Sequence, residues 1–211
     1  ERRKMLYLLG AEIILTPASK GMRGAIEKAQ EIESNTPNAF MPQQFSNNSN
    51  PEIHCQTTAE EIWSDTGGKI DAIIAGIGTG GTFTGIGRTL KKRKPNIRMI
   101  AIEPEDSPII SGGIPGPHKI QGIGAGFIPD NLDTSLIDEV IQIGNETALI
   151  TARQAARLEG LPVGISSGAA LAAALEVGSR SDMLDKKIIV ILPSFAERYL
   201  STALFDGINN R

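Results

Sequence analysis

Several residue types are scarce in this chain of 211 residues, and each scarcity excludes a class of protein. The one cysteine, Cys55, cannot form a disulfide within the chain, which excludes a disulfide-stapled secreted domain. The two histidines, His54 and His118, lie far apart without an acidic or thiol cluster, so we expect structural roles and no metal site. No apolar run approaches the roughly 20 residues that a membrane-spanning helix needs. We therefore expect a cytoplasmic protein with no membrane partner.

A strong excess of one charge is also missing, since 21 Lys and Arg residues stand against 24 Asp and Glu residues, with a net charge of -3. This balance gives no general attraction to nucleic acid, and we expect no nucleic-acid partner. A basic run does occupy residues 91–94, but it ends an expected helix just before Pro95, where cations favour the helix dipole. We interpret this run as structural.

What the chain does contain is an alternation of short β-branched apolar runs with amphipathic stretches of helical period. The expected strands are residues 12–16, 70–75, 99–102, 139–143 and 187–192. The expected helices are residues 20–34, 58–66, 81–94, 146–159 and 167–179. This order predicts an α/β fold in which mostly parallel strands are joined by crossover helices.

Local signals mark two helix boundaries and one unusual loop. Asn145, followed by Glu146, supplies an acceptor and a negative charge at a helix start, and Gly160 predicts the end of that helix. Residues 104–129 hold six glycines and five prolines, which predicts a functional loop or a mobile flap rather than a simple connector. The chain begins without an initiator Met and in what reads as an amphipathic helix, so we expect its natural N-terminus to be missing.

The most informative segment is the glycine-rich turn at residues 76–82, which follows the expected strand 70–75 and opens the next expected helix. Closely spaced glycines let backbone N–H groups converge on an anion, and the helix N-terminus adds its positive dipole end. The hydroxyls of Thr79 and Thr82 can donate further hydrogen bonds. The turn therefore predicts a phosphate site that requires no Lys or Arg.

Other interpretations of this turn have to be weighed. A nucleotide P-loop is excluded, because no Lys-Ser/Thr pair follows the glycines at the required spacing. A dinucleotide site stays open, because Gly76, Gly78 and Gly81 match G-x-G-x-x-G and Glu103 ends the next strand, about where a ribose-binding acid would stand. A tight strand-to-helix turn without any ligand also stays open.

Ordered segments along nearly the whole chain resemble one family closely. They are residues 20–25, 43–47, 78–82, 117–129, 164–170 and 197–202. They resemble segments of the cysteine synthases (O-acetylserine sulfhydrylases), in the β-family of pyridoxal-phosphate enzymes. The resemblance implies a tryptophan-synthase-β-like, fold type II architecture that is truncated at its N-terminus. It also implies that residues 1–45 are the remainder of a mobile N-terminal lobe and that residues 46–211 form the lobe that binds the cofactor phosphate.

The resemblance also implies roles for individual residues. The cofactor pyridoxal 5'-phosphate would be held at its phosphate by Gly78, Thr79, Gly80, Gly81 and Thr82, and at its pyridine nitrogen by Ser166. A neutral hydroxyl in that place does not enforce protonation of the ring, which suits β-elimination. The alternative for Ser166 is a cap of the Ala-rich helix that begins at Ser167 or Gly168.

Substrate contacts are implied for a second group of residues. Gln44 would bind the substrate α-carboxylate, while Gly122, Gly124 and Ala125 would line a mouth loop that moves as the site closes. For Gln44 the alternative is a loop glutamine that satisfies backbone groups.

The activity implied is the exchange of the acetoxy group of O-acetyl-L-serine for sulfide, giving L-cysteine and acetate, in a homodimer that can engage serine acetyltransferase. Cystathionine or cyanoalanine formation, or an inactive binding module, are alternatives.

Two departures from the family stand out. We find no Schiff-base lysine, because the sequences around Lys4, Lys20, Lys28 and Lys69 do not resemble the lysine motif of the family. No catalytic residue is therefore assigned, and the chain alone is expected to be inactive. Ala196 replaces the usual glycine, which would strain its turn if φ is positive there.

Overall fold

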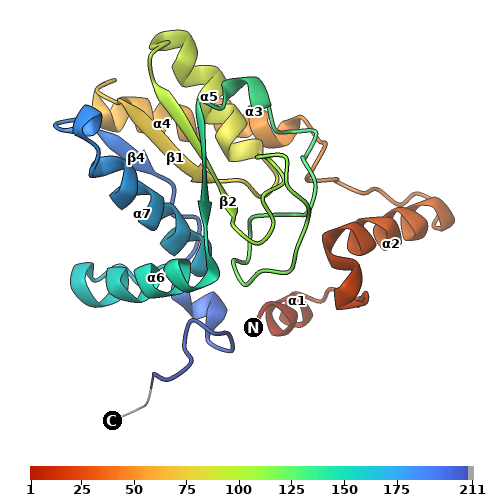
Figure 1. Cartoon of the computed structure of the whole chain (residues 1–211). Coiled ribbons are helices and arrows are strands. Elements are labelled where there is room, and N and C mark those ends of the chain that lie inside the picture. The colour runs from red at the N-terminus through yellow and green to blue at the C-terminus, as the bar shows by residue number, and fades with distance from the viewer. Residues whose placement is uncertain (209–211) are drawn as a thin grey trace.

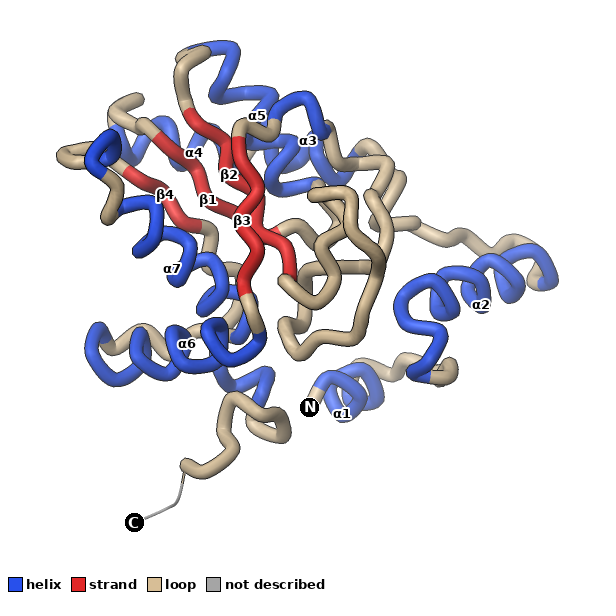
Figure 2. Tube along the Cα trace, viewed as in Figure 1, coloured by secondary structure: helices blue, strands red, loops and turns tan. Residues whose placement is uncertain are grey.

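The computed structural model describes residues 1–208 and has an α/β architecture, shown as a cartoon in Figure 1 and as a tube in Figure 2. The helices are α1 (Arg2–Leu8), α2 (Gly21–Asn35), α3 (Ser49–Gln56), α4 (Thr58–Thr66), α5 (Gly81–Arg93), α6 (Asn145–Glu159) and α7 (Ile165–Gly178). The strands are β1 (Ala72–Gly76), β2 (Arg98–Pro104), β3 (Glu139–Ile143) and β4 (Ile188–Val190). Short 3-10 helices are η1 (Ala18–Lys20), η2 (Thr134–Leu136), η3 (Ser181–Met183) and η4 (Ala196–Tyr199).

The four strands form one parallel sheet in the order β3-β2-β1-β4. Because successive strand residues point to opposite faces, Ile74 of β1 packs with the alanine-rich faces of α6 and α7, whereas Ile73 packs with the apolar side chains of α5. The helices thus lie on both faces of the sheet (Figure 1). In a parallel sheet all carboxyl ends meet at one edge, and the loops at that edge build the site.

Most of the expected elements are present. Helix α4 and strand β3 have the predicted bounds, and α2, α5, α6 and α7 begin and end within two residues of theirs. The expected strands 70–75, 99–102 and 187–192 correspond to β1, β2 and β4. The basic run lies in the last turn of α5 and just beyond it, as expected, where Lys91 pairs with Asp138 at 2.6 Å.

Two elements were predicted wrongly. Residues 12–16 form no strand, and Ile14 and Leu15 are 52% and 63% exposed. A strand needs a neighbour for its backbone N–H and C=O groups, and no described strand pairs with this segment. Helix α3 was not expected, because its sequence has little apolar periodicity and carries Pro51, which a helix tolerates only in its first turn.

The expected role of Asn145 is also wrong. Gly144 is the N-cap of α6 and no side chain caps it. The Asn145 side chain instead accepts a hydrogen bond from Lys119 N at 2.6 Å and donates one to Asp106 at 2.5 Å, so it fastens the loop 104–129. The other end follows the prediction, because Gly160 adopts the left-handed conformation with φ 66°.

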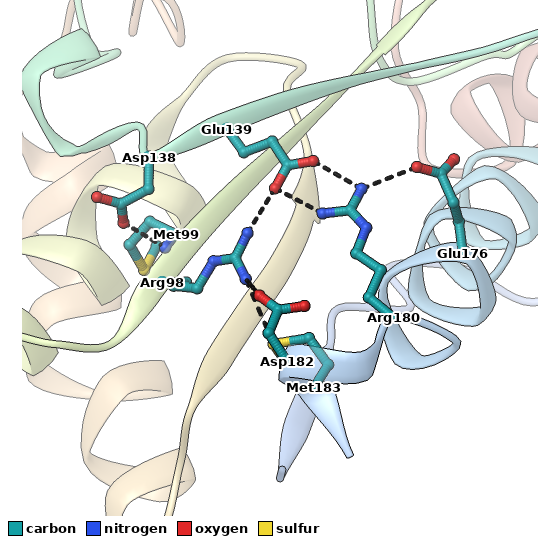
Figure 3. Close-up of polar contacts among 8 residues, drawn as sticks. All are labelled: Arg98, Met99, Asp138, Glu139, Glu176, Arg180, Asp182 and Met183. Carbon is teal, nitrogen blue, oxygen red and sulfur yellow. Dashed lines mark hydrogen bonds and ion pairs between the residues drawn. The ribbon is translucent and has the colours of Figure 1, made fainter.

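A charged network joins the strands at the amino-terminal edge of the sheet (Figure 3). Arg98 at the start of β2 pairs with Glu139 at the start of β3 at 2.8 Å. Arg180, just after α7, donates to both Glu139 carboxylate oxygens at 2.8 and 2.9 Å, and also pairs with Glu176 at 2.9 Å. The hydrogen bonds from Arg180, with the nearby Arg98 charge, lower the pKa of Glu139.

The first 40 residues lie beside the sheet domain rather than on it, as the red and orange ribbon of Figure 1 shows. Glu1 accepts hydrogen bonds from Ser201 N and Ser201 Oγ, both at 2.8 Å, and the Arg2 guanidinium lies over the Tyr199 ring. Apolar side chains of this segment, such as Leu8 and Leu9, stay largely exposed. Among the described residues, no helix is long and apolar enough to cross a membrane.

Candidate functional site

A cavity of about 190 Å³ opens at the carboxyl end of β1, beside the turn that leads into α5. The turn contributes Gly78, Thr79, Gly80 and Thr82 to its wall. Gly122 of the loop 104–129 and Ser166 of α7 reach the same cavity from other parts of the chain. The structure thus brings together two segments that the sequence suggested for a cofactor and one suggested for substrate.

The backbone of the turn is arranged for an anion. The N–H groups of Gly78, Thr79, Gly80, Thr82 and Phe83 donate to no acceptor within residues 1–208. Such groups are rarely left unpaired in folded proteins unless water or a ligand satisfies them. The first N–H groups of α5 and the positive end of its dipole both favour an anion at the start of the helix. The turn therefore has the chemistry of a phosphate-binding site. The residues present therefore fit a phosphate-bearing ligand.

Glycine is required at two positions of the turn for different reasons. Gly80 has φ 82°, and a Cβ there would also lie 2.8 Å from the Leu132 side chain. Gly78 has no such backbone constraint, but a Cβ on it would overlap the carbonyl oxygen of Gly122. Gly81, expected at the phosphate, does not line the cavity and packs behind it against the Asn50 side chain.

Helix α3 fixes both threonine hydroxyls of the turn. Asn50 Nδ2 donates to Thr79 Oγ1 at 2.9 Å, and His54 Nε2 lies 3.1 Å from Thr82 Oγ1. Asn50 and His54 are four residues apart and so share one face of α3. The other His54 nitrogen, Nδ1, lies 2.8 Å from Thr58 Oγ1, and burial lowers the pKa of His54. The imidazole is therefore held as a neutral hydrogen-bonding link behind the turn.

Ser166 lies in the first turn of α7 and is 4% exposed. Helix α7 begins at Ile165 with Gly164 as its N-cap, and no side chain caps it, so the capping role suggested for Ser166 is wrong. Its hydroxyl makes no hydrogen bond to another described residue, and Ser166 lines the cavity. A hydroxyl that opens to a cavity and has no protein partner suits a ligand atom.

The residues expected at the substrate are only partly brought together. Gly122 lines the cavity, whereas Gly124 and Ala125 line a smaller pocket behind the loop, with Ser107. Gln44 is exposed and is not among the lining residues. Its side chain bonds to no described residue, so the alternative of a buried glutamine that satisfies backbone groups is wrong.

The dinucleotide interpretation fails on Glu103. This carboxylate is 2% exposed and accepts hydrogen bonds from Ile110 N at 2.7 Å, Ser111 N at 3.1 Å and Ser111 Oγ at 2.5 Å. Its oxygens are therefore engaged in anchoring the loop 104–129. They are not directed to a ribose.

The structure also shows where the lysines, Ala196 and His118 lie. Lys4, Lys20, Lys28 and Lys69 do not line the cavity, and Lys28 pairs with Glu31 at 2.6 Å. Ala196 does not have a positive φ, so the strain considered there is absent, and its N–H donates to Pro162 O at 2.8 Å. His118 Nε2 donates to Gly124 O at 3.0 Å.

Sequence reasoning missed Asn50 and Asn131. Asn131 is 3% exposed and donates from Nδ2 to Gln44 O at 2.8 Å. Nothing in the local sequence marks either asparagine, because each has a partner far away along the chain: Asn50 lies 29 residues from Thr79, and Asn131 lies 87 residues from Gln44.

Comparisons with known proteins agree with this geometry. A family model for pyridoxal-phosphate dependent enzymes matches residues 1–194. Cysteine synthase A of Escherichia coli K12 is 56% identical over an alignment of 217 positions, which covers 99% of this chain and 67% of that protein. The crystal structure of cysteine synthase from Entamoeba histolytica has a TM-score of 0.92 at 42% identity, covering 100% of this chain and 62% of that one. The O-acetylserine dependent cystathionine beta-synthase from Helicobacter pylori has a TM-score of 0.90 at 43% identity, covering 97% and 66%.

The chain belongs to the family of pyridoxal-phosphate-dependent enzymes. Two of these three similar proteins are cysteine synthases. The expected fold class and the cofactor pyridoxal phosphate are confirmed. The chain spans about two thirds of the length of these relatives.

Proposed function

We propose that the protein carrying this chain is a cysteine synthase, which replaces the acetoxy group of O-acetyl-L-serine with sulfide to give L-cysteine and acetate. One observation carries the proposal: unpaired N–H groups and the Ser166 hydroxyl, which lacks a protein partner, line the same cavity. The names of the similar cysteine synthases support it.

Different residues of the chain would bind different parts of the cofactor. Pyridoxal phosphate, when bound, supplies an electron sink that weakens bonds at the α-carbon of an amino acid. The turn 78–82 would hold its phosphate through neutral donors, with hydroxyls from Thr79 and Thr82. Ser166 would hydrogen-bond the ring nitrogen without imposing a charge on it. The loop around Gly122 would cover the cavity and exclude water.

Gln44 would bind the substrate carboxylate from the turn 43–47. The turn lies near the cavity wall, since Gln44 O is bonded to Asn50, which is bonded to Thr79. The side chain of Gln44 is exposed and uncommitted, as a substrate-binding amide requires. Gly124 and Ala125 would act indirectly, by shaping the loop that carries Gly122.

The proposal is tested at Ser166. Ser166→Ala should retain pyridoxal phosphate and lower turnover about fivefold, because one neutral hydrogen bond of about 1 kcal/mol is lost. Ser166→Asp should shift the absorbance of the bound cofactor, because a carboxylate favours a protonated ring nitrogen. Absorbance after dialysis measures retention and spectrum, and product analysis measures cysteine. If neither variant changes the spectrum or the rate, Ser166 is not the ring partner.

A second reaction is favoured by one comparison, because the similar Helicobacter pylori protein is named an O-acetylserine dependent cystathionine beta-synthase. Parallel assays with sulfide and with homocysteine as acceptor separate the two reactions. A higher kcat/KM with homocysteine would reassign the acceptor and leave the cofactor site unchanged.

Three finer points are also proposed on the likeness to the family. They are a cytoplasmic location, a homodimer, and an association with serine acetyltransferase. Sedimentation of the purified protein, alone and with that enzyme, tests the last two.

A further inference from the structure

Asn50 contacts the cofactor side and the substrate side of the proposed site with one nitrogen atom. Its Nδ2 donates to Gln44 O at 2.8 Å and to Thr79 Oγ1 at 2.9 Å. A backbone carbonyl only accepts hydrogen bonds, so the atom that faces Gln44 O must be the amide nitrogen. Both hydrogens of that nitrogen are therefore committed, one to each segment.

On the cofactor side this contact orients the Thr79 hydroxyl. Thr79 Oγ1 accepts from Asn50 Nδ2 at 2.9 Å and from Gly81 N at 3.4 Å. A hydroxyl has two acceptor lone pairs and one donor hydrogen, so the hydrogen of Thr79 is left to point elsewhere. Because Thr79 lines the cavity, this hydrogen is available to an anion there.

On the substrate side, the hydrogen bond from Asn50 to Gln44 O holds the turn 43–47, whose backbone is strained. Gln43 has φ 47°, which is unusual for a residue other than glycine, and its carbonyl accepts from Ser46 N and Asn47 N at 3.2 and 2.9 Å. Gln44 O accepts a second amide hydrogen bond, from Asn131 Nδ2 at 2.8 Å. A left-handed residue persists only where its surroundings impose it, and these two amides supply that constraint.

We propose that Asn50 is a positioning residue that couples an anion in the turn 78–82 to the order of the turn 43–47. An anion that accepts from the Thr79 hydroxyl polarises that group and strengthens its bond to Asn50, since linked hydrogen bonds reinforce one another. A stronger bond to Thr79 restricts the motion of the Asn50 side chain, and the hydrogen bond from the same nitrogen to Gln44 O is thereby held in place. Cofactor binding would in this way prepare the segment that carries the proposed substrate residue Gln44.

The inference rests on the proposed function only in taking the phosphate of pyridoxal phosphate as the anion. A merely structural Asn50 predicts a different result, namely a stable turn 43–47 whose motion is indifferent to ligand. Amide hydrogen exchange separates the two cases, because it reports each turn by itself and does not depend on catalysis.

The experiment compares hydrogen exchange of the purified protein with and without pyridoxal phosphate, and with inorganic phosphate as a second probe. In the wild type, ligand should slow hydrogen exchange in residues 78–83. It should also slow exchange in residues 45–47 by about fivefold, which is the low end of the coupling usually found between two sites. Asn50→Asp, which cannot donate, should lose the response at 45–47. Thr79→Val should also lose the response to ligand at 45–47, although Asn50 is intact. This variant tests the coupling if Asn50→Asp does not fold.

Asn131→Asp is the matched control, because Asn131 donates to the same carbonyl without touching Thr79. It should speed exchange at 45–47 in the free protein and keep the response to ligand. If ligand protects residues 78–83 of the wild type but leaves 45–47 unchanged, the coupling is refuted while the cofactor site stands. If 78–83 show no protection, both the proposed function and the coupling are refuted.

Discussion

Gly78 lies directly against the backbone carbonyl of Gly122, so closely that no Cβ fits between them. One residue earlier, Ile77 O accepts a hydrogen bond from Gly124 N at 3.0 Å. The glycine turn and the mouth loop are thus interlocked through backbone atoms. Any side chain on Gly78 must displace one of the two segments.

Gly78→Ala is therefore expected to destabilise the protein by about 1–3 kcal/mol through overpacking, and to weaken pyridoxal phosphate binding. Gly178→Ala is the control, because its Cβ would only make ordinary contact, 3.6 Å from Ile188 Cδ1. Urea unfolding monitored by circular dichroism measures both variants. Equal stability of the two would show that the loop yields freely at Gly122.

Gly80→Ala separates backbone strain from obstruction at the phosphate turn. Gly80 and Gly160 both have positive φ, but only Gly80 would place a Cβ against a neighbour, 2.8 Å from Leu132. Each alanine should cost about 1 kcal/mol from its left-handed conformation. Gly80→Ala alone should also lose cofactor affinity, measured by fluorescence titration with pyridoxal phosphate. A similar loss in Gly160→Ala would show that general destabilisation explains the effect.

His54 predicts an acid-sensitive turn. Burial lowers the pKa of His54 from its ordinary value of 6.5. The unfolded chain then binds the proton more readily, so the contribution of His54 is present above pH 6.5 and is lost as pH falls below 6.5 toward the lowered folded pKa. His54→Gln, which keeps hydrogen-bonding ability without titrating, should flatten the stability curve between pH 6.5 and the carboxylate range. Parallel curves for both proteins would assign the loss to other groups.

Glu139 is expected to matter for stability at the sheet edge away from the site. Glu139→Gln removes the charge that Arg98 and Arg180 share and should cost about 1 kcal/mol, discounted for its partial exposure. Glu176→Gln, which removes a more exposed partner of Arg180, should cost less than about 0.5 kcal/mol. Because the pKa of Glu139 is lowered from 4.5, its contribution is present above pH 4.5 and is lost as pH falls through the folded pKa. Denaturant titrations at pH 7 and pH 3 test this, since the difference between wild type and Glu139→Gln should shrink in acid.

Residues 1–211 expressed alone are expected to make no cysteine above the enzyme-free rate. No lysine lines the described cavity wall, and the turn cannot supply a general base. The assay contains pyridoxal phosphate, O-acetylserine and sulfide, with borohydride trapping of any lysine adduct. A trapped adduct at Lys4, Lys20, Lys28 or Lys69, together with activity, would contradict this expectation.

The sequence predicted those features that short-range patterns determine. Helix α4 and strand β3 follow from local periodicity, and the turn 78–82 follows from glycine spacing after a buried strand. Residues 12–16 have the composition of a strand, but pairing depends on a neighbour, which composition does not reveal. The same limit hid Asn50, whose role arises from contacts with Gln44 and Thr79 that form only in the folded chain.

The turn into α5 presents only neutral donors to the cavity, and no Lys or Arg stands among the described residues that line it. Attraction to an anion there comes from short-range dipoles rather than from a mobile positive side chain. Added salt screens such buried interactions far less than it screens exposed ion pairs. Retention of a phosphate ligand should therefore vary little with ionic strength, and the turn itself carries no formal charge that would demand a counter-ion.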